Sequence, residues 1–188
     1  MELIFCTTNS QKFAKGHAVC KEYGINLTQK IVEIDEIQSE DVIRVAQDKA
    51  KNAYALVRRP VVVSDDAWEI SGLRGFPGTY AKSINTWFTV DDYLRLTRPL
   101  TDKRIIFVQS LVYQDDKSSK LFVKKIEGTL LDKARGNKNL PPIQQIVSLD
   151  ASGKSIAQII GNNTHYTGKE PLAIWEDFAK WYKKQGKS

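Results

Sequence analysis

The chain is poor in the residues that build disulfide-linked, zinc-binding or membrane-spanning proteins. It has 188 residues with two cysteines and two histidines, and no Cys/His cluster shows the spacing of a zinc site. Cys6 and Cys20 both fall in expected regular structure, which indicates buried thiols in a reducing cytosol rather than a disulfide scaffold. No apolar run approaches the roughly 20 residues that span a bilayer, and residues 1–5 are acidic and strand-like, unlike a signal peptide. We therefore expect a cytoplasmic protein that does not contact a membrane.

Internal repeats, linkers and low-complexity segments are also absent, so residues 1–188 are expected to form a single domain, compact or with two lobes. The net charge is +6 and the pI is about 9.2, which suits nucleic acid or a small polyanion such as a nucleotide. The lysines are scattered, with a modest concentration over residues 180–187. Scattered lysines are more typical of solubility than of a binding face, so we expect a nucleotide and not a nucleic acid as the partner.

One stretch, residues 61–80, organises the rest of the chain. Val61 to Val63 is a short β-branched run, typical of a strand that is buried on both faces. The strand is expected to end in two adjacent carboxylates, Asp65 and Asp66. Adjacent acids at the end of a buried strand repel each other and resist desolvation, and a hard cation such as Mg²⁺ is the usual remedy. The alternative is that both are turn residues that cap the next segment.

The first third of the chain predicts the order strand, helix, strand, helix, strand. The three expected strands are Leu3 to Cys6, Leu27 to Ile34 and the run at residues 61–63. Right-handed crossovers through the two helices make such strands parallel. Thr7 to Asn9, Glu36 and the Asp65-Asp66 pair would then all follow carboxyl ends of strands, the edge at which open α/β sheets bind ligands.

The segment after the first strand has the pattern of a phosphate-binding loop. Asn9 or Ser10 is a good N-cap for a helix that ends near Gly24. The free N–H groups and the dipole at such a helix start both favour phosphate. Lys12, in the first turn, opposes the dipole unless an anion lies nearby. The alternative is a simple helix cap with a solvated lysine. His17, on the apolar side of this helix, is expected in the core.

A second helix is expected from Ser39, as its N-cap, to Arg58-Arg59, with Glu40 and Asp41 in its first turn. Its expected apolar stripe is Val42, Ala46, Ala53 and Leu56. Lys49 falls in the middle of this stripe. A lysine at such a position either extends its stem toward solvent or reaches an anion in a cleft.

The second half of the chain predicts a long antiparallel hairpin followed by a closing helix. The expected elements are a helix over 86–96, strands over 104–114 and 120–131, a loop over 132–142, a strand over 143–149, a short helix over 152–160 and the closing helix over 170–184. His165 falls in the loop before that last helix and is a better candidate for a site than His17. Together the elements predict an α/β fold with a mixed, twisted sheet.

Four motifs resemble those of the inosine/xanthosine triphosphate pyrophosphatases, house-cleaning enzymes that hydrolyse deaminated purine nucleoside triphosphates to the monophosphate and pyrophosphate. They are Thr7-Thr8-Asn9-Ser10-Gln11-Lys12, similar to the family's Thr-x-Asn-x-x-Lys phosphate loop; Glu36 before Gln38, similar to its metal-binding glutamate; Lys49 in Asp48-Lys49-Ala50, similar to its helix lysine; and Ser64-Asp65-Asp66 followed by Gly75-Phe76-Pro77-Gly78-Thr79-Tyr80, similar to its acidic strand end and Gly-x-Pro-Gly-x-Tyr turn. The last motif is the most specific of the four.

The resemblance implies a magnesium-dependent homodimer whose subunit has two lobes around a central cleft. By resemblance, Glu36 and Asp66 hold Mg²⁺, with Asp65 as a further ligand or supporting group, and Asp66 also orients or deprotonates the attacking water. The residues that would bind the triphosphate are Thr7, Asn9, Lys12 and Lys49, and His165 would contact the base or the sugar.

The resemblance weakens in the second half of the chain. The family has an aromatic-Gly-aromatic-Asp-Pro motif that stacks on the base, where this chain has Asn139-Leu140-Pro141-Pro142-Ile143. The family's Ser-His-Arg is replaced by Thr164-His165-Tyr166, which keeps the histidine and loses the arginine. Two alternatives therefore stay open: an enzyme of the same chemistry for another modified nucleotide, and a nucleotide- or nucleic-acid-binding protein without turnover.

Overall fold

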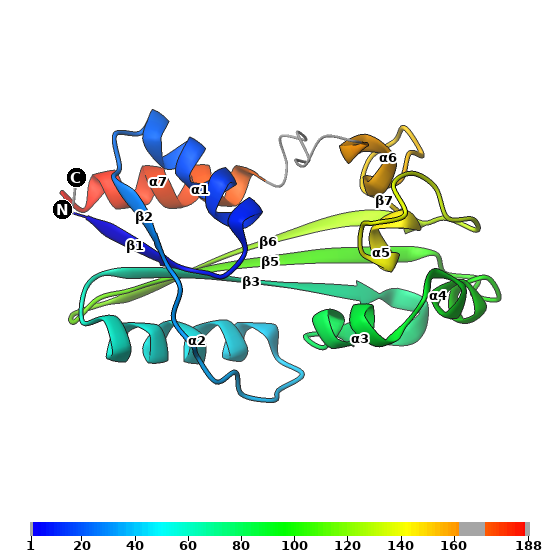
Figure 1. Cartoon of the computed structure of the whole chain (residues 1–188), viewed down its shortest axis with the longest axis horizontal. Helices are drawn as coiled ribbons and strands as arrows, with labels where there is room; N and C mark the ends of the chain where they lie inside the picture. The colour runs from blue at the N-terminus through cyan, green and yellow to red at the C-terminus, as the bar shows by residue number, and fades with distance from the viewer. Residues whose placement is uncertain (1, 162–171, 187–188) are drawn as a thin grey trace. The chain divides into compact units, whose positions relative to one another are not determined.

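The computed structural model describes residues 2–161 and 172–186 (Figure 1). Its elements, in chain order, are β1 (Leu3–Cys6), α1 (Ser10–Glu22), β2 (Leu27–Lys30), α2 (Val42–Val57), β3 (Val61–Ile70), the 3₁₀ turn η1 (Ser71–Leu73), β4 (Pro77–Gly78), α3 (Ala81–Trp87), α4 (Val90–Thr97), β5 (Arg104–Gln114), β6 (Ser119–Leu130), α5 (Pro142–Gln145), β7 (Val147–Ser148), α6 (Ile156–Ile160) and α7 (Ala173–Lys184). The strands form one seven-stranded sheet in the order β2-β1-β3-β5-β6-β7, with β4 on β3. The predicted α/β class with a mixed sheet is confirmed.

The chain divides into two compact units that share the three long strands. The first unit comprises Met1–Asp66, Gln109–Lys124 and Gly168–Ser188, and the second comprises Ala67–Val108 and Lys125–Thr167. The strands β3, β5 and β6 each contribute residues to both units. No helix in the described ranges is long and apolar enough to cross a membrane.

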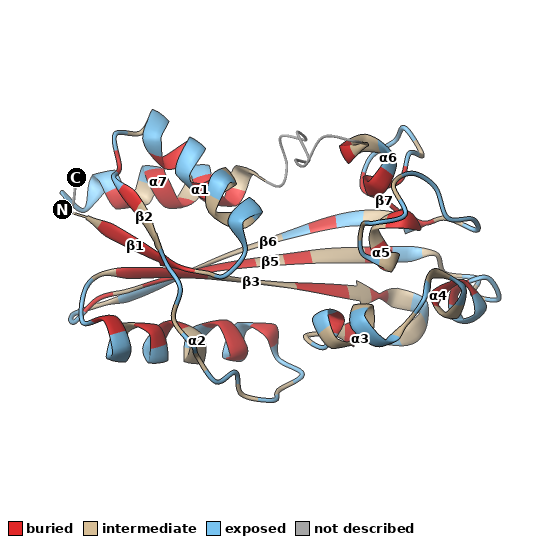
Figure 2. Cartoon of the chain, in the orientation of Figure 1, coloured by how far each residue is buried: buried red, intermediate tan, exposed pale blue. Residues whose placement is uncertain are grey.

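In the first unit, β1 lies between β2 and β3 and is parallel to both, as predicted. Successive strand side chains point to opposite faces of a sheet, so β1 serves two cores. Leu3 and Phe5 belong to a core formed with α1 and α7, whereas Ile4 and Cys6 belong to a core formed with α2. Figure 1 shows α1 and α7 on one face of β1 and α2 on the other. Figure 2 shows that most of β1 is buried, as expected for a strand that is covered on both faces and apolar on both.

A close approach of α1 to α7 fixes the first of these cores. A Cβ atom on Gly16 would lie 2.5 Å from Cζ2 of Trp175, so a glycine is required where the indole crosses α1. Trp175 in turn packs edge-on against Phe5, with 5.0 Å between ring centroids. His17, the next residue on α1, is exposed, and its predicted core position is wrong, because the helix turns it away from this contact.

The second core depends on the apolar face of α2. Asp41, and not Ser39, is the N-cap, since its side chain accepts hydrogen bonds from the N–H groups of Ile43 and Arg44. The buried residues of α2 are Val42, Val45, Ala46, Ala50, Ala53 and Val57. Leu56, which was expected in this stripe, is 59% exposed. The true stripe follows Val57 instead, one residue further around the helix.

Two strands have different lengths from those expected. β2 ends at Lys30 rather than at residue 34. Among the described strands, β2 lies at the edge of the sheet and pairs with β1, which ends at Cys6, so β2 has no ladder to continue beyond that point. In contrast, β3 continues from Val61 to Ile70, because β5 and then β4 pair with it after β1 has ended.

In the second unit, one core gathers the ends of β3, β5 and β6 with the helices α3 to α6. Its largest fully buried side chains include Tyr93, Ile70 and Ile105. The helix expected over 86–96 is two helices, because Thr89 starts α4 with a reciprocal capping box to Asp92. The first part of the strand expected over 143–149 belongs instead to the short helix α5, which Pro142 starts, and within this range Val147–Ser148 pairs with β6.

The hairpin of β5 and β6 is placed as predicted, to within one residue at its ends. Asp115 forms the turn between the strands, and its carboxylate accepts hydrogen bonds from the N–H groups of Lys117 and Ser118. So short a connection makes the two neighbouring strands antiparallel. The short helix expected over 152–160 begins only at Ile156, since Ser155 is its N-cap. The closing helix ends at Lys184 as predicted, and its expected start at residue 170 lies outside the described residues.

Candidate active site

The loop between β1 and α1 is closed by side-chain caps. Asn9 is the N-cap of α1, as predicted, and its side-chain oxygen accepts hydrogen bonds from the N–H groups of Gln11 and Lys12 at 3.0 and 3.1 Å. The N–H of Asn9 donates in turn to Oγ1 of Thr7 at 3.1 Å. The first turn of α1 contains no acidic residue, so its positive end is left without a protein carboxylate of its own.

An ion pair joins this helix start to β3. Nζ of Lys12 lies 3.0 Å from Oδ2 of Asp66. Burial opposes the charge on Lys12, but the carboxylates of Asp66, Asp65 and Glu36 outweigh it and hold the pKa of Lys12 above its usual value. Lys12 is therefore a charged group at neutral pH, and the predicted phosphate-loop lysine and the predicted catalytic aspartate are in contact.

A second ion pair joins α2 to the segment that precedes it. Nζ of Lys49 lies 2.5 Å from Oε1 of Glu36. The side chain of Lys49 is only 18% exposed, whereas that of Glu36 is 43% exposed. The stem of Lys49 is therefore largely buried, and its amine contacts the carboxylate of Glu36.

Asp65 lies in the field of both ion pairs. Burial raises the pKa of Asp65, Lys49 and Lys12 lower it, and Glu36 and Asp66 raise it again, so that it stays above its usual value. Asp65 and Asp66 are neighbours on β3, so their side chains point to opposite sides of the sheet. Asp66 points toward Lys12 on α1, and Asp65 points toward the face covered by α2.

The carboxylates were expected after the end of a strand, and this is wrong in detail, because Asp65 and Asp66 lie inside β3. The expected edge is nevertheless present, because the pairing between β1 and β3 stops at Phe5 and Val62. Ser110 on β5 donates a hydrogen bond to the backbone oxygen of Asp65 at 2.9 Å and so fixes this part of β3.

The donors at this edge suit a hard cation in their chemistry, since carboxylate oxygens are the ligands that Mg²⁺ prefers. Ser64, next to Asp65, has a buried hydroxyl with no hydrogen-bond partner among the described residues, which leaves a further oxygen unsatisfied. Within residues 2–161 and 172–186, however, no three acidic, histidine or cysteine side chains are grouped as a metal site. In this arrangement, Lys12 and Lys49 are the partners of Asp66 and Glu36.

The predicted site histidine and the two cysteines add no described group to this cluster. His165 lies outside the described residues. Cys6 and Cys20 are buried free thiols, as expected, and burial raises their pKa values to about 11 and about 12. Thiols with such pKa values remain protonated at neutral pH, so neither is a candidate nucleophile.

Sequence reasoning missed Lys15, which lies one helical turn after Lys12. Burial lowers the pKa of Lys15, Asp66 raises it and Lys12 lowers it further, so its amine lies within the field of the same cluster. The spacing of three residues between two lysines at a helix start was the available signal. Lys12 and Lys15 therefore approach Asp66 from one face of α1.

Comparison with known proteins shows the family of this chain. The model of the Ham1 family matches residues 3–157. The chain belongs to the Ham1 family. This confirms the resemblance that the four motifs indicated, and the matched range contains the whole charged cluster.

Named relatives of this Ham1-family chain are nucleotide hydrolases. A dITP/XTP pyrophosphatase of Saccharolobus solfataricus is 30% identical over 131 residues, which cover 70% of this chain and 68% of the relative. A dITP/XTP pyrophosphatase of Methanopyrus kandleri is 23% identical over 184 residues, 97% of each chain. A solved HAM1 protein of Coxiella burnetii superposes with a TM-score of 0.82 at 16% identity and covers 98% of this chain and 99% of its own, which shows the same fold.

Proposed function

We propose that this Ham1-family protein hydrolyses nucleoside triphosphates, of modified purines in the first place, to the monophosphate and pyrophosphate. The observation that carries the proposal is the charged cluster of the first unit. There, Lys12 and Lys49 meet Asp66 and Glu36, with Asp65 in the field of both pairs. Cations for a triphosphate and carboxylates for a hard metal ion are the two components that phosphoanhydride hydrolysis needs. The names of the relatives support this chemistry.

In this proposal, Lys12 and Lys49 hold the triphosphate, and Thr7 and Asn9 shape the loop that receives it. Asp66 orients the attacking water and accepts its proton. A positioned carboxylate within hydrogen-bond reach of the water is the kind of group that accepts such a proton. Neither role requires a covalent nucleophile.

Glu36, Asp66 and Asp65 would hold Mg²⁺. When bound, the cation would neutralise charge on the phosphate oxygens and on the leaving pyrophosphate. In the structure, Asp66 and Glu36 are each occupied by a lysine. A triphosphate would draw these lysines away and free the two carboxylates, so we expect nucleotide and cation to bind with positive coupling.

A related enzyme for a different modified base is a second candidate, favoured by the loop at residues 139–143. Leu140 packs against the core of the second unit, and its backbone oxygen accepts a hydrogen bond from the Gln145 side chain at 2.8 Å. Leu140 is therefore a packing residue and supplies no aromatic ring for stacking. A binding protein without turnover is the remaining alternative, and its nucleotide binding would not require Mg²⁺.

The decisive experiment measures pyrophosphate release from ITP, XTP, GTP, ATP and their deoxy forms, with Mg²⁺ and with EDTA. We expect release from at least one substrate with Mg²⁺ and none with EDTA. If the protein binds nucleotide equally with Mg²⁺ and with EDTA and releases no pyrophosphate, only the binding-protein alternative is left. The homodimer, the cytoplasmic location and the contact of His165 with the base or sugar also stay proposals, and light scattering would test the first of them.

A further inference from the structure

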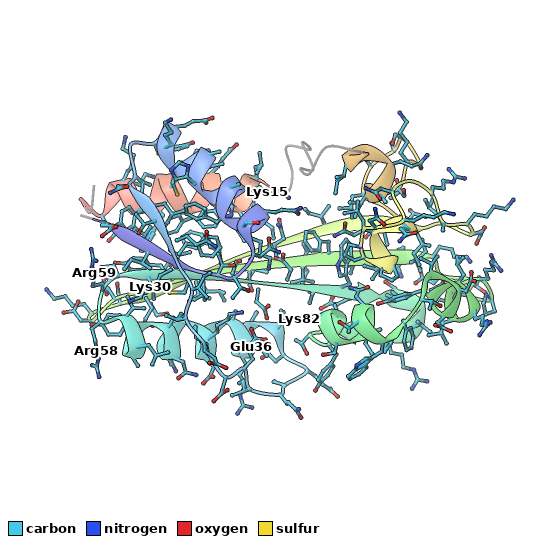
Figure 3. The ribbon with its side chains drawn as sticks, viewed as in Figure 1. Lys15, Lys30, Glu36, Arg58, Arg59 and Lys82 are labelled. Atoms are coloured by element: carbon cyan, nitrogen blue, oxygen red, sulfur yellow. The ribbon has the colours of Figure 1, made fainter. Side chains whose placement is uncertain are left out.

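Lys15 is a half-buried lysine in the proposed active site with no assigned role (Figure 3). It lies on α1 three residues after Lys12, so the two side chains share one face of the helix. The amine is close enough to Asp66 and to Lys12 for both to act on its charge. The structure gives it no hydrogen bond and no ion pair with any described residue.

The other two lysines of the cluster differ from Lys15 in this respect. Lys12 is paired with Asp66, and Lys49 is paired with Glu36. Both are therefore neutralised before any ligand binds. Among the described residues, Lys15 forms no ion pair, although its side chain is partly removed from water. A lysine in that position is costly unless an anion compensates it.

The position of Lys15 in the helix adds to this cost. The N-terminal half of α1 contains Lys12 and Lys15, and its first turn has no acidic residue. Both lysines oppose the helix dipole, whose positive end lies at Asn9. Lys21 on the same helix behaves as a solvated lysine does, since it is exposed and lies in the last turn, where the dipole favours a cation. The contrast indicates that Lys15 is placed for an anion and not for solubility.

We propose that Lys15 is a third phosphate-binding lysine, which contacts the polyphosphate chain of the substrate and the pyrophosphate product. The inference rests on the proposed function, since it places the ligand in the same cluster. Lys15 adds a third lysine to a cluster in which Lys12 meets Asp66 and Lys49 meets Glu36. The added cation compensates the acidic residues that would otherwise repel a triphosphate, and it remains available when Lys12 and Lys49 are still paired.

The test is calorimetric titration of inorganic pyrophosphate, with Mg²⁺, into the wild type and into Lys15→Met. Methionine keeps the stem packing and removes the charge. We expect the Kd for pyrophosphate to rise by about tenfold or more, as for a lost charge-assisted hydrogen bond. Lys21→Met is the matched control on the same helix and should bind as the wild type does. Lys15→Arg should restore most of the binding, which a purely structural role would not explain.

Two readouts separate this inference from the proposed function. If Lys15→Met binds pyrophosphate as tightly as the wild type, while Lys12→Met binds it weakly, the inference is wrong even if the enzyme is active. If the wild type releases no pyrophosphate from any nucleotide but binds pyrophosphate through Lys15, the inference stands and the proposed reaction fails. A wild type that binds no pyrophosphate overturns the inference. Thermal unfolding of each variant establishes that the comparison is made between folded proteins.

Discussion

Lys12 on α1 and Asp66 on β3 are 3.0 Å apart, so the lysine proposed for phosphate already contacts the carboxylate proposed for the metal ion and the water. Lys49 and Glu36 repeat this arrangement at 2.5 Å. Each pair thus contains one lysine proposed to bind phosphate and one carboxylate proposed to bind the metal ion. In the absence of ligand, the lysine and the carboxylate of each pair neutralise each other, and substrate binding must replace both contacts. The mutual dependence of the two halves underlies the first three predictions.

Asp66→Asn should lower the turnover of the preferred nucleotide by a factor of roughly 10²–10⁴, the usual contribution of a positioned proton acceptor. It removes a metal ligand and a base in one change, while the amide keeps the size of the side chain. Asp177→Asn is the control, because it removes a surface carboxylate that pairs with Lys124 at 2.8 Å in the same unit. The measurement is the kcat of both variants from steady-state kinetics. Full turnover in Asp66→Asn would refute the proposed role of Asp66 as metal ligand and base.

Asp65→Asn should stabilise the metal-free protein at neutral pH while it lowers activity. The pKa of Asp65 is raised in the folded protein, first by burial, so the folded state binds the proton more tightly than the unfolded state. Stability is therefore lost as the pH rises from the usual pKa of an aspartate through the pKa of Asp65 in the folded protein. Asparagine has no such cost, so the variant's advantage is full above that interval and disappears below it.

The measurement for Asp65→Asn is the Tm in EDTA across the acidic to neutral range. A Tm difference that does not change with pH would contradict the electrostatic origin of the effect. A lower Tm at neutral pH would show that the field of Lys12 and Lys49 outweighs burial, against the direction of the pKa shift. Gains in stability from replacing site residues are common, because such sites are built for function.

Lys49→Met should weaken nucleotide binding and leave the Tm unchanged or raise it. The stem of Lys49 lies in the apolar face of α2, where methionine can replace it, and Glu36 is exposed enough to be solvated when its partner is lost. Lys51→Met, on the exposed side of the same helix, is the control. Normal binding together with a lower Tm would show that Lys49 is structural.

Gly16→Ala should destabilise the first unit, although alanine is the better helix former by about 1 kcal/mol. The new Cβ would come within 2.5 Å of Trp175, which is 5% exposed and packs against Phe5. Overpacking of this kind typically costs about 1–3 kcal/mol. Ala18→Gly on the exposed side of α1 gives the propensity difference alone. Denaturant unfolding tests both, and a Gly16→Ala variant more stable than the wild type would mean that Trp175 can move aside.

The sequence predicted those parts of the fold that local signals determine. β1 and β5 were placed correctly because apolar and β-branched runs end at polar turns, and α1 was placed by the cap at Asn9. The early end of β2 and the length of β3 could not be predicted, because they depend on where neighbouring strands stop. The break between α3 and α4 was missed because the capping box at Thr89 was not considered.

Most residues of the candidate site were predicted from the sequence, but their contacts were not. Motif spacing singled out Lys12, Lys49 and Asp66, and the topology brought them together at one edge of the sheet. The pairing of each lysine with a carboxylate depends on side-chain positions that only the tertiary structure fixes. Lys15 was missed because its spacing of three residues from Lys12 places it on the same helix face but does not show that its side chain is half-buried, whereas that of Lys21 is exposed.

Base selectivity should be looser than that of the inosine and xanthosine enzymes, or directed to another modified base. Stacking on an aromatic ring contributes roughly 1–3 kcal/mol per base, and the described loop at residues 139–143 offers no ring, since Leu140 packs into the core. The position of the family's arginine holds Tyr166, whose single hydroxyl cannot form the two-pronged contact of a guanidinium. A site without those polar partners rejects an analogue less strongly.

The measurement is kcat/KM for ITP, XTP, GTP and ATP under one set of conditions. We expect a ratio of ITP to GTP smaller than that of the Saccharolobus solfataricus relative assayed in parallel. Tyr166→Arg is the matched variant, because it returns the guanidinium to the family's position, and it should raise the preference for ITP over ATP. A strong preference for ITP and XTP in the wild type, with no gain in Tyr166→Arg, would mean that other residues read the keto group of the purine.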